Sequence, residues 1–468
     1  MDTTTKTEPA GETTLAEPKR DTSGIAGHPR GLMVLFFTEF WERFSYYGMR
    51  ALLTLYMAHP VSDGGVAFSE SRRALVYGTY TMSVYLTALP GGLIADRFLG
   101  AKLAVLVGGI IIALGHFSMA FPSLTTFYAG LCLIAIGTGF LKPNISAMVG
   151  GLYQENDPRR DSGFSIYYMG INLGAFVSPF VCGYLAQTQS FRNFLTSIGV
   201  DPLSSWHWGF AAAGVGMSLG LVTYLSFRGR LAHVGLRPKE RKRLETKGVD
   251  QPLTRDDWMR IGAIFVLFVF SIVFWGVYEQ AGSTLTLFAD KFTHNQVFGN
   301  GFPPSYYQSI QAIFVILLSP VFAWVWIKLR RREPSSPAKF AFGLFFVALS
   351  ILLMVPASML AASGPVSPMW LFSVYFISVV GELCLSPVGL STVTKLAPAK
   401  FVGIMMGVWF VSIALGNFLA GFISRFFSGE DTSILVRLFG FTGIAVLVAA
   451  SILALMTPWV RKLMGRVH

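Results

Sequence analysis

The sequence predicts an all-α integral membrane protein, and three observations lead to this prediction. Of the 468 residues, 53% are hydrophobic and 13% are charged, whereas soluble domains carry about 25% charged residues. Apolar segments follow one another from residue 31 to residue 460, and each reaches the roughly 20 residues that a helix needs to cross a bilayer. Basic residues gather in alternate connections between these segments. A water-soluble globular fold is therefore excluded.

Twelve transmembrane helices are expected. The first six segments cover residues 31–58, 74–95, 101–121, 124–150, 163–186 and 207–227. The second six cover residues 258–289, 305–329, 338–361, 368–394, 400–426 and 433–460. Residues 1–29 are mostly polar, and we expect a disordered cytoplasmic tail there. Residues 461–468 are expected to form a second, short cytoplasmic tail.

The net charge of +12 has two candidate explanations. A basic surface could bind nucleic acid, or the excess could mark the cytoplasmic loops of a membrane protein. One set of connections holds Arg97, Lys102, Arg159, Arg160, eight basic residues from Arg228 to Lys247, Lys328, Arg330, Arg331, Arg332, Lys339, Lys395, Lys400, Arg461, Lys462 and Arg466. The opposite set holds Arg72, Arg73, Arg192, Lys291, Arg425 and Arg437. This asymmetry favours loops over nucleic acid and predicts that both termini are cytoplasmic.

The basic segment 228–257 divides the chain into two halves, residues 30–227 and 258–460. Basic connections at 95–102 and 328–339 occupy equivalent places in the two halves. Two six-helix bundles joined by a basic cytoplasmic linker describe the major facilitator fold, whose substrate site lies near the midplane between the bundles. An unrelated twelve-helix protein with a coincidental central loop is the alternative.

The first segment carries ionisable residues within the membrane, where such residues mark substrate or ion pathways. A stripe along one face of this predicted helix consists of Glu39, Glu42, Arg43, Tyr46, Tyr47 and Arg50. Since bare charges cannot face lipid, this face must meet water or a partner helix. The alternative is a static ion pair of Arg43 with Glu39 or Glu42 that locks two helices together.

Three further segments carry charges. Lys142 lies in the fourth, Glu279 in the seventh one turn after Trp275, and Glu382 in the tenth with Ser386 one turn away. The first and fourth segments of each half are equivalent, so a central cavity lined by both bundles is expected. Four polar or aromatic residues could line this cavity, although for each one alone packing is favoured; they are Tyr85, Asn172, Gln311 and Trp409.

The sequence shows no catalytic signature. It contains no Walker motif, no HExxH and no nucleophile elbow. Its three cysteines, Cys132, Cys182 and Cys384, lack metal-binding spacing. We therefore expect no enzyme activity, no metal, no cofactor and no ATP-driven pumping by this chain.

Long motifs recur along the chain. The first half contains Glu39-Phe-Trp-Glu42-Arg43-Phe-Ser-Tyr46-Tyr47-Gly48, Gly-Phe-Leu-Lys142-Pro-Asn144 and Phe164-Ser-Ile-Tyr-Tyr-Met-Gly-Ile-Asn172. The second half contains Trp275-Gly-Val-Tyr-Glu279-Gln280, Gly381-Glu382-Leu-Cys-Leu-Ser386-Pro and Met405-Met406-Gly407-Val-Trp409. From about residue 30 to about residue 460, the chain resembles the proton-dependent oligopeptide transporters of the major facilitator superfamily.

The resemblance implies proton-coupled import of di- and tripeptides by alternating access. It implies that proton coupling uses Glu39, Glu42, Arg43 and Glu279. It implies that the peptide carboxylate binds Arg43 and Lys142, and that the peptide amine binds Glu382 and Asn172. The other implied pocket residues are Tyr46, Tyr47, Arg50, Tyr85, Trp275, Gln311, Ser386 and Trp409. Two implied gates are Arg50 with Glu279 on the outer side and Lys142 with Glu382 on the inner side.

The sequence departs from the family pattern in three places. Residues 228–257 are too few for the two extra helices of many bacterial members. Gln311-Ala312 replaces a common Asn-Pro, and Gly78 follows Tyr77 where animal members have a histidine. Proton coupling would therefore rest on the carboxylates, with a proton gradient as the driving force.

Two other functions remain open at this stage. One is a carrier of nitrate, an amino acid or a drug-like solute on the same scaffold. The other is a membrane sensor or enzyme that keeps the fold without translocating. The expected partners are small peptides, protons and the lipid bilayer, with no nucleic acid. The protein is expected to be a monomer in the plasma (inner) membrane.

Overall fold

The computed structural model describes residues 21–154, 157, 159–232, 234–235, 253–297, 299–329, 332–398 and 402–465. In the first half, the helices are α1 (Arg30–Ala58), α2 (Glu70–Leu86), α3 (Ala88–Ile94), α4 (Ala101–Met119), α5 (Leu124–Gly151), α6 (Arg160–Gln187), α7 (Gln189–Ser197) and α8 (Ser205–Ser226). In the second half, they are α10 (Arg255–Tyr278), α11 (Thr284–Phe292), α12 (Tyr307–Leu329), α13 (Ser336–Leu352), α14 (Met354–Ala361), α15 (Met369–Leu396), α16 (Val402–Ser424) and α17 (Thr432–Met464). The short strands β1 (Gln296–Val297) and β2 (Asn300–Gly301) pair antiparallel.

The predicted all-α membrane fold is confirmed. Among the described residues, ten helical segments are long and apolar enough to cross a membrane. The first two predicted spans fall outside this group, because α1 carries four charged residues in its middle and the second span breaks at Thr87 into α2 and α3. With these two, the helices fit the predicted twelve, and each end differs from its predicted position by no more than four residues.

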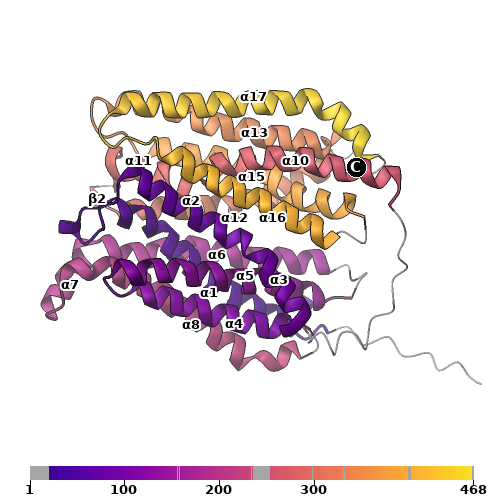
Figure 1. The fold of residues 1–468 in the computed structure, drawn as a ribbon, viewed down its shortest axis with the longest axis horizontal. Coiled ribbons are helices and arrows are strands. Elements are labelled where there is room, and N and C mark those ends of the chain that lie inside the picture. The colour runs from indigo at the N-terminus through magenta and orange to yellow at the C-terminus, as the bar shows by residue number, and fades with distance from the viewer. Residues whose placement is uncertain are drawn as a thin grey trace, which may run out of the picture.

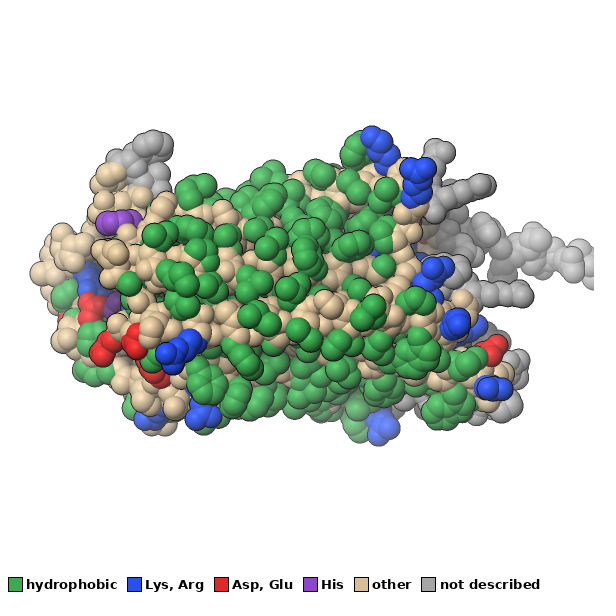
Figure 2. Space-filling view, turned by 90° about the horizontal axis from the view of Figure 1, so that it is seen from above, with side chains coloured by type: hydrophobic (Ala, Val, Ile, Leu, Met, Phe, Trp, Pro, Cys, Tyr) green, Lys and Arg blue, Asp and Glu red, His purple; other side chains and the backbone are tan. Residues whose placement is uncertain are grey.

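The helices run side by side along the long axis of the molecule (Figure 1). We call the end where α1 begins and α17 ends the terminal end, and the opposite end, with α7 and the β1–β2 pair, the distal end. Apolar side chains cover the middle of the visible surface, and charged side chains gather toward the two ends (Figure 2). This distribution suits a protein whose middle lies in lipid.

Each half has its own buried apolar clusters. Leu52, Trp206 and Phe210 belong to a cluster of the first half, whereas Phe274 and Leu344 belong to a large cluster of the second. The division of the chain into two bundles at the basic linker remains our proposal, and these separate clusters support it.

The chain ends differ in part from the predicted tails. Residues 21–29 contain a 3₁₀ turn at Ile25–Gly27, and Arg159 donates a 3.1 Å hydrogen bond to the carbonyl oxygen of Asp21. A polar group of the α5–α6 connection thus binds the backbone of this segment, and the disordered tail over residues 1–29 stays a prediction. Residues 1–20 lie outside the described residues, as do 236–252 of the predicted linker. At the other end, α17 continues through Met464, and 466–468 are outside the description.

The two halves approach each other closely where α2 crosses α16. A Cβ atom at Gly421 would lie 2.4 Å from the Cα atom of Gly78, so the two backbones meet without room for a side chain. Small residues allow such close approach of membrane helices. A second junction joins α6 and α12, where Ser309 donates a 2.8 Å hydrogen bond to the carbonyl oxygen of Phe176.

Gly421→Ala is expected to lower the melting temperature by about 2 °C or more, because the new methyl group forces α2 and α16 apart. Gly262→Ala on α10 is the matched control, since a Cβ atom there meets no atom within 4 Å. Thermal unfolding of both variants in detergent checks the prediction. Equal melting temperatures for the two variants would contradict the close α2–α16 contact.

Candidate substrate and proton site

The charged stripe on α1 is buried. The exposed fractions of Glu39, Glu42 and Arg43 are 2%, 0% and 3%. The Nε atom of Arg43 lies 3.1 Å from Oε1 of Glu39, and it also donates to Glu42. All three residues lie on α1, so this ion pair does not lock two helices together. Two carboxylates share one guanidinium, which leaves a net charge of −1 unless one carboxyl group binds a proton.

The three side chains have unused hydrogen-bonding capacity. Oε2 of Glu39, Oε1 of Glu42 and Nη2 of Arg43 are buried, and none has a hydrogen-bond partner among the described residues. Buried polar atoms normally find partners, and those that lack one call for an explanation. The unpaired Nη2 can donate to an anionic ligand group, and either carboxylate oxygen can accept a proton.

Arg50 connects the two halves of the chain. It donates a 3.1 Å hydrogen bond to the hydroxyl of Tyr77 and forms a buried ion pair with Glu279 from the second half. Thr54, one turn further along α1, donates a 2.7 Å hydrogen bond to the carbonyl oxygen of Gly282. These contacts join the two halves on the distal side of the site, and the role of Arg50 and Glu279 as an outer gate stays a prediction.

Lys142 and Glu382 are not paired with each other among the described residues. Nζ of Lys142 lies 3.8 Å from the centre of the Tyr85 ring, a cation–π contact. Glu382 accepts a hydrogen bond from the hydroxyl of Tyr278. The implied inner gate is therefore not formed in this conformation, in which the two halves are joined on the distal side.

Tyr278 belongs to the motif of the seventh segment, but no site role was predicted for it. Helix α10 ends at Tyr278, and a 3₁₀ turn begins at Glu279. These two neighbouring side chains have different partners, since Tyr278 donates a hydrogen bond to Glu382 and Glu279 pairs with Arg50. The Tyr278 ring stacks on Phe274, with centroids 5.5 Å apart. Its place in the Trp275–Gln280 motif beside Glu279 was the sequence signal, but a tyrosine in an apolar segment usually packs.

The aromatic stripe residues lie against the arginines. The guanidinium of Arg43 lies 5.3 Å from the centre of the Tyr46 ring, and that of Arg50 lies 5.9 Å from the Tyr47 ring. Tyr46 is buried, whereas Tyr47 keeps part of its surface exposed. The structure thus brings both tyrosines together with the charged stripe.

The remaining predicted residues fall into two groups. Trp275 Nε1 and Gln311 Nε2 are buried donors without an acceptor among the described residues, so they can bind a ligand. Asn172 donates 3.0 Å to the carbonyl oxygen of Tyr168 in its own helix. Trp409 packs edge-to-face on Phe340, 6.0 Å between centroids.

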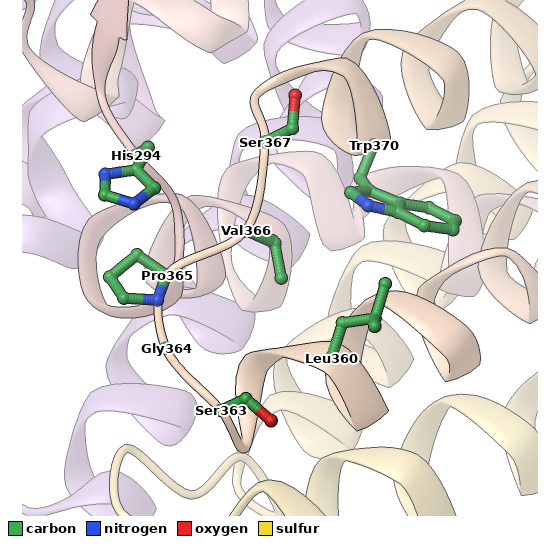
Figure 3. A pocket seen from close by; sticks show the side chains of 8 residues that line it. All are labelled: His294, Leu360, Ser363, Gly364, Pro365, Val366, Ser367 and Trp370. Carbon is green, nitrogen blue, oxygen red and sulfur yellow. The ribbon is translucent and has the colours of Figure 1, made fainter.

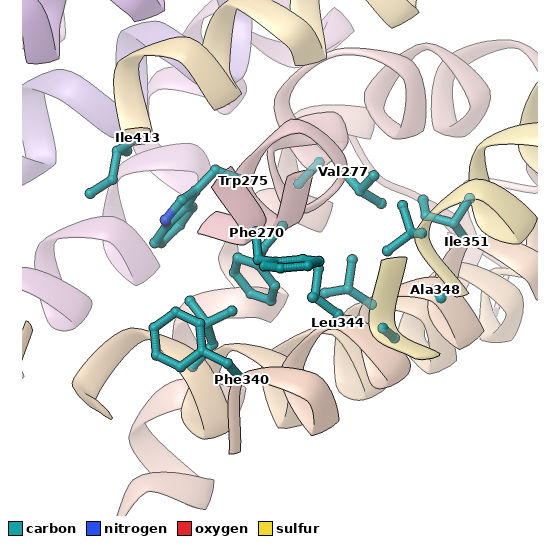
Figure 4. Close-up of a cluster of buried hydrophobic side chains, with 14 of the residues drawn as sticks. Phe270, Trp275, Val277, Phe340, Leu344, Ala348, Ile351 and Ile413 are labelled. Carbon is teal, nitrogen blue, oxygen red and sulfur yellow. The ribbon is translucent and has the colours of Figure 1, made fainter. Parts of the chain in front are cut away.

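Packing thus accounts for Trp409, and Figure 4 shows its partner Phe340 with Trp275 in the buried cluster of the second half. Ser386 is half-buried.

A shallow surface pocket lies elsewhere, between the β1 connection and the α14–α15 connection (Figure 3). Its walls include His294, Ser363 and Trp370. None of the predicted site residues lines it, so it is separate from the charged centre.

Comparison with known proteins places the chain in one family. The chain matches the POT family over residues 102–247 and 248–442. It is 37% identical over 507 residues to the peptide transporter YePEPT of Yersinia enterocolitica subsp. palearctica, covering 94% of this chain and 96% of that protein. It is 34% identical over 505 residues to a di-/tripeptide transporter of Lactococcus lactis subsp. cremoris, covering 94% of this chain and 98% of that protein.

A solved structure agrees with this match over almost the whole chain. A mutant of the peptide transporter POT, crystallised in complex with alafosfalin, is 39% identical. It superposes with a TM-score of 0.84 and covers 95% of this chain and 98% of that chain. These relatives are transporters by name, and the sequence match extends across both halves. The protein is therefore a multi-pass membrane transporter that belongs to the POT family.

Proposed function

We propose that this protein imports di- and tripeptides together with protons by alternating access. The observation that carries the proposal is the distribution of charge within the membrane-spanning helices. The first half supplies Arg43 and the half-buried Lys142, and the second half supplies Glu382. Arg43 forms a partly unpaired group with Glu39 and Glu42. To bind a zwitterionic peptide, the protein must place a positive group near the peptide carboxylate and a negative group near the peptide amine.

In the proposed binding mode, the peptide carboxylate binds Arg43 and Lys142. Lys142 rests on the Tyr85 ring, so it can turn to the carboxylate without breaking an ion pair. The amine binds Glu382 in place of, or beside, the Tyr278 hydroxyl. Asn172 is proposed to assist at the amine, and the wall residues Tyr46, Tyr47, Trp275, Gln311, Ser386 and Trp409 tolerate varied side chains.

Proton coupling is proposed to act through the exchange of ion-pair partners. Protonation of Glu279 would release Arg50 and open the distal side, and protonation of Glu42 would free Arg43 for the peptide carboxylate. Each exchange avoids a buried charge without a partner, which is costly in a medium of low dielectric constant. The inward-open and outward-open conformations would then differ in which ion pairs Arg43 and Arg50 form, as alternating access requires.

Orientation and assembly are part of the proposal. The positive-inside rule favours a cytoplasmic terminal end, so both termini would be cytoplasmic and the distal end would face outward, in the plasma (inner) membrane. One chain supplies both bundles and all site residues, which favours a monomer as the transporting unit. The proton gradient is proposed to drive transport, with no cofactor.

A competition panel in proteoliposomes tests the substrate class. Unlabelled di-, tri- and tetrapeptides, nitrate and single amino acids compete against one labelled dipeptide. We expect di- and tripeptides to inhibit uptake and the other compounds to leave it unchanged. Inhibition by nitrate or by a single amino acid, but not by peptides, would support the rival carrier. Binding without counterflow would support a sensor that does not translocate.

Tyr278→Phe is expected to lower the stability of the peptide-free protein by about 1–3 kcal/mol, because the buried Glu382 carboxylate loses its donor. A peptide amine supplies a new donor, so a dipeptide should raise the melting temperature more in the variant than in the wild type. An N-acetylated dipeptide, which lacks the ammonium group, should not. Tyr184→Phe, at an exposed tyrosine, is the control. If the free dipeptide and the N-acetylated dipeptide raised the melting temperature of Tyr278→Phe by the same amount, the role of Glu382 in binding the amine would be contradicted.

A further inference from the structure

A second titratable contact joins the two halves at the distal end. His59 follows the last residue of α1, and its two ring nitrogens face two different carboxylates. Nδ1 lies 2.7 Å from Oδ2 of Asp63, and Nε2 lies 3.4 Å from the carboxylate of Asp290. A neutral imidazole has one N–H group and can donate to only one carboxylate. The imidazolium form, with two N–H groups, suits both.

The two carboxylates belong to different halves of the chain. Asp63 ends the 3₁₀ turn Val61–Asp63 after α1, and Asp290 lies on α11. Asp290 therefore follows Glu279 along the same broken seventh span. Protonated His59 bridges the halves at a position beyond the Arg50–Glu279 pair, nearer to the distal end.

The charges around His59 balance only when it is protonated. Arg192 from α7 lies 2.5 Å from the second oxygen of Asp63. The Trp206 ring packs 5.1 Å from the His59 ring, and its Nε1 atom donates to the carbonyl oxygen of Asp63. Two carboxylates, one guanidinium and one imidazolium sum to zero. Loss of one imidazole proton leaves a charge of −1 and a single N–H group. When this group stays on Nδ1, in the shorter contact with Asp63, the hydrogen bond to Asp290 of the other half is lost.

Water at the distal end can reach this group, because 23% of the His59 side chain is exposed. Burial alone would lower the pKa of His59, but the hydrogen bonds and charges of Asp290 and Asp63 outweigh it and raise the pKa above its usual value near 6.5. The contact is thus fully made below about pH 6.5 and is lost as the pH rises through the higher pKa of the folded protein.

We propose that His59 is an additional proton-binding site of the transport cycle, whose protonation from the distal side holds the two halves closed there. The proposal rests on the proposed function in one respect, that the distal end faces the acidic outer medium. A proton from that medium binds the imidazole, and the cation attracts Asp290 of the opposite half. External acidity would then favour distal closure in addition to protonating the buried carboxylates.

Distance measurements between the two halves test this proposal without transport. Spin labels are placed on exposed distal residues, Ser197 in the first half and Glu430 in the second. Peptide-free protein is examined by double electron–electron resonance between pH 5 and pH 9. We expect the ratio of closed to open protein to fall about threefold or more as the pH rises in the wild type. His59→Gln should remove this fall, and any pH dependence that remains should have the opposite sign, because protonation of Glu279 is proposed to open the distal side.

Two further variants make the test specific. Asp290→Asn should remove the same pH dependence, and the double variant should behave like either single variant, because both act through one contact. His294→Gln is the matched control, since His294 is an exposed distal histidine. A closed-to-open ratio that still falls with rising pH in His59→Gln, or an equal loss of the fall in His294→Gln, would overturn the proposal. Peptide uptake is assayed separately, so failure of the transport proposal would not alter this result.

Discussion

Glu42→Gln is expected to reduce gradient-driven peptide accumulation to the level measured with no gradient, while peptide counterflow continues. Glu42 is fully buried and bound to Arg43. A glutamine keeps the shape of the side chain but cannot exchange a proton. The carrier can then still exchange peptide across the membrane, but it cannot draw on the proton gradient.

Counterflow and pH-driven accumulation of a labelled dipeptide are measured in the same proteoliposomes. Glu70→Gln is the control, because Glu70 is an exposed carboxylate at the start of α2. It should behave like the wild type in both assays. Unchanged accumulation in Glu42→Gln would show that the proton is carried by another group.

Replacing either partner of the Arg50–Glu279 pair is expected to open the distal side and to abolish uptake. Removal of one partner of a buried ion pair costs about 3–5 kcal/mol, because the other charge stays buried and uncompensated. The variants lose this stabilisation only in the distally closed form. A change of this size can reverse the equilibrium between the closed and open forms. Arg50→Gln and Glu279→Gln should therefore both favour the open form.

The double variant Arg50→Gln/Glu279→Gln distinguishes this explanation from general damage. With both charges removed, no uncompensated charge remains, and the double variant should be closed more often than either single variant. Distal distances report this difference directly. An effect of the double variant equal to the sum of the two single effects would contradict a direct ion pair.

Much of the fold could be predicted from the sequence, because lipid imposes long apolar segments whose ends are marked by polar residues. The breaks within spans could not. The second span breaks at Thr87, whose hydroxyl donates to the carbonyl oxygen of Ala135 on another helix. The amphipathic helix α7 was also missed, because its nine residues are too short and too polar to resemble a span.

The candidate site could be predicted as a set of residues but not as a set of contacts. Helical spacing alone placed the stripe from Glu39 to Arg50 on one face, and family resemblance paired Arg50 with Glu279. Neither could reveal that Tyr278 donates a hydrogen bond to Glu382, or that Lys142 makes a cation–π contact with Tyr85. These contacts depend on the conformation that the protein adopts. His59 was not selected, since its partners come together only in the folded chain.

Uptake of a labelled dipeptide into proteoliposomes with an imposed pH gradient tests the central proposal most directly. With the outside acidic, we expect the peptide to accumulate above its external concentration and to leak out when a protonophore collapses the gradient. Uptake with the same rate and extent in the presence and absence of the gradient would contradict proton-coupled peptide import.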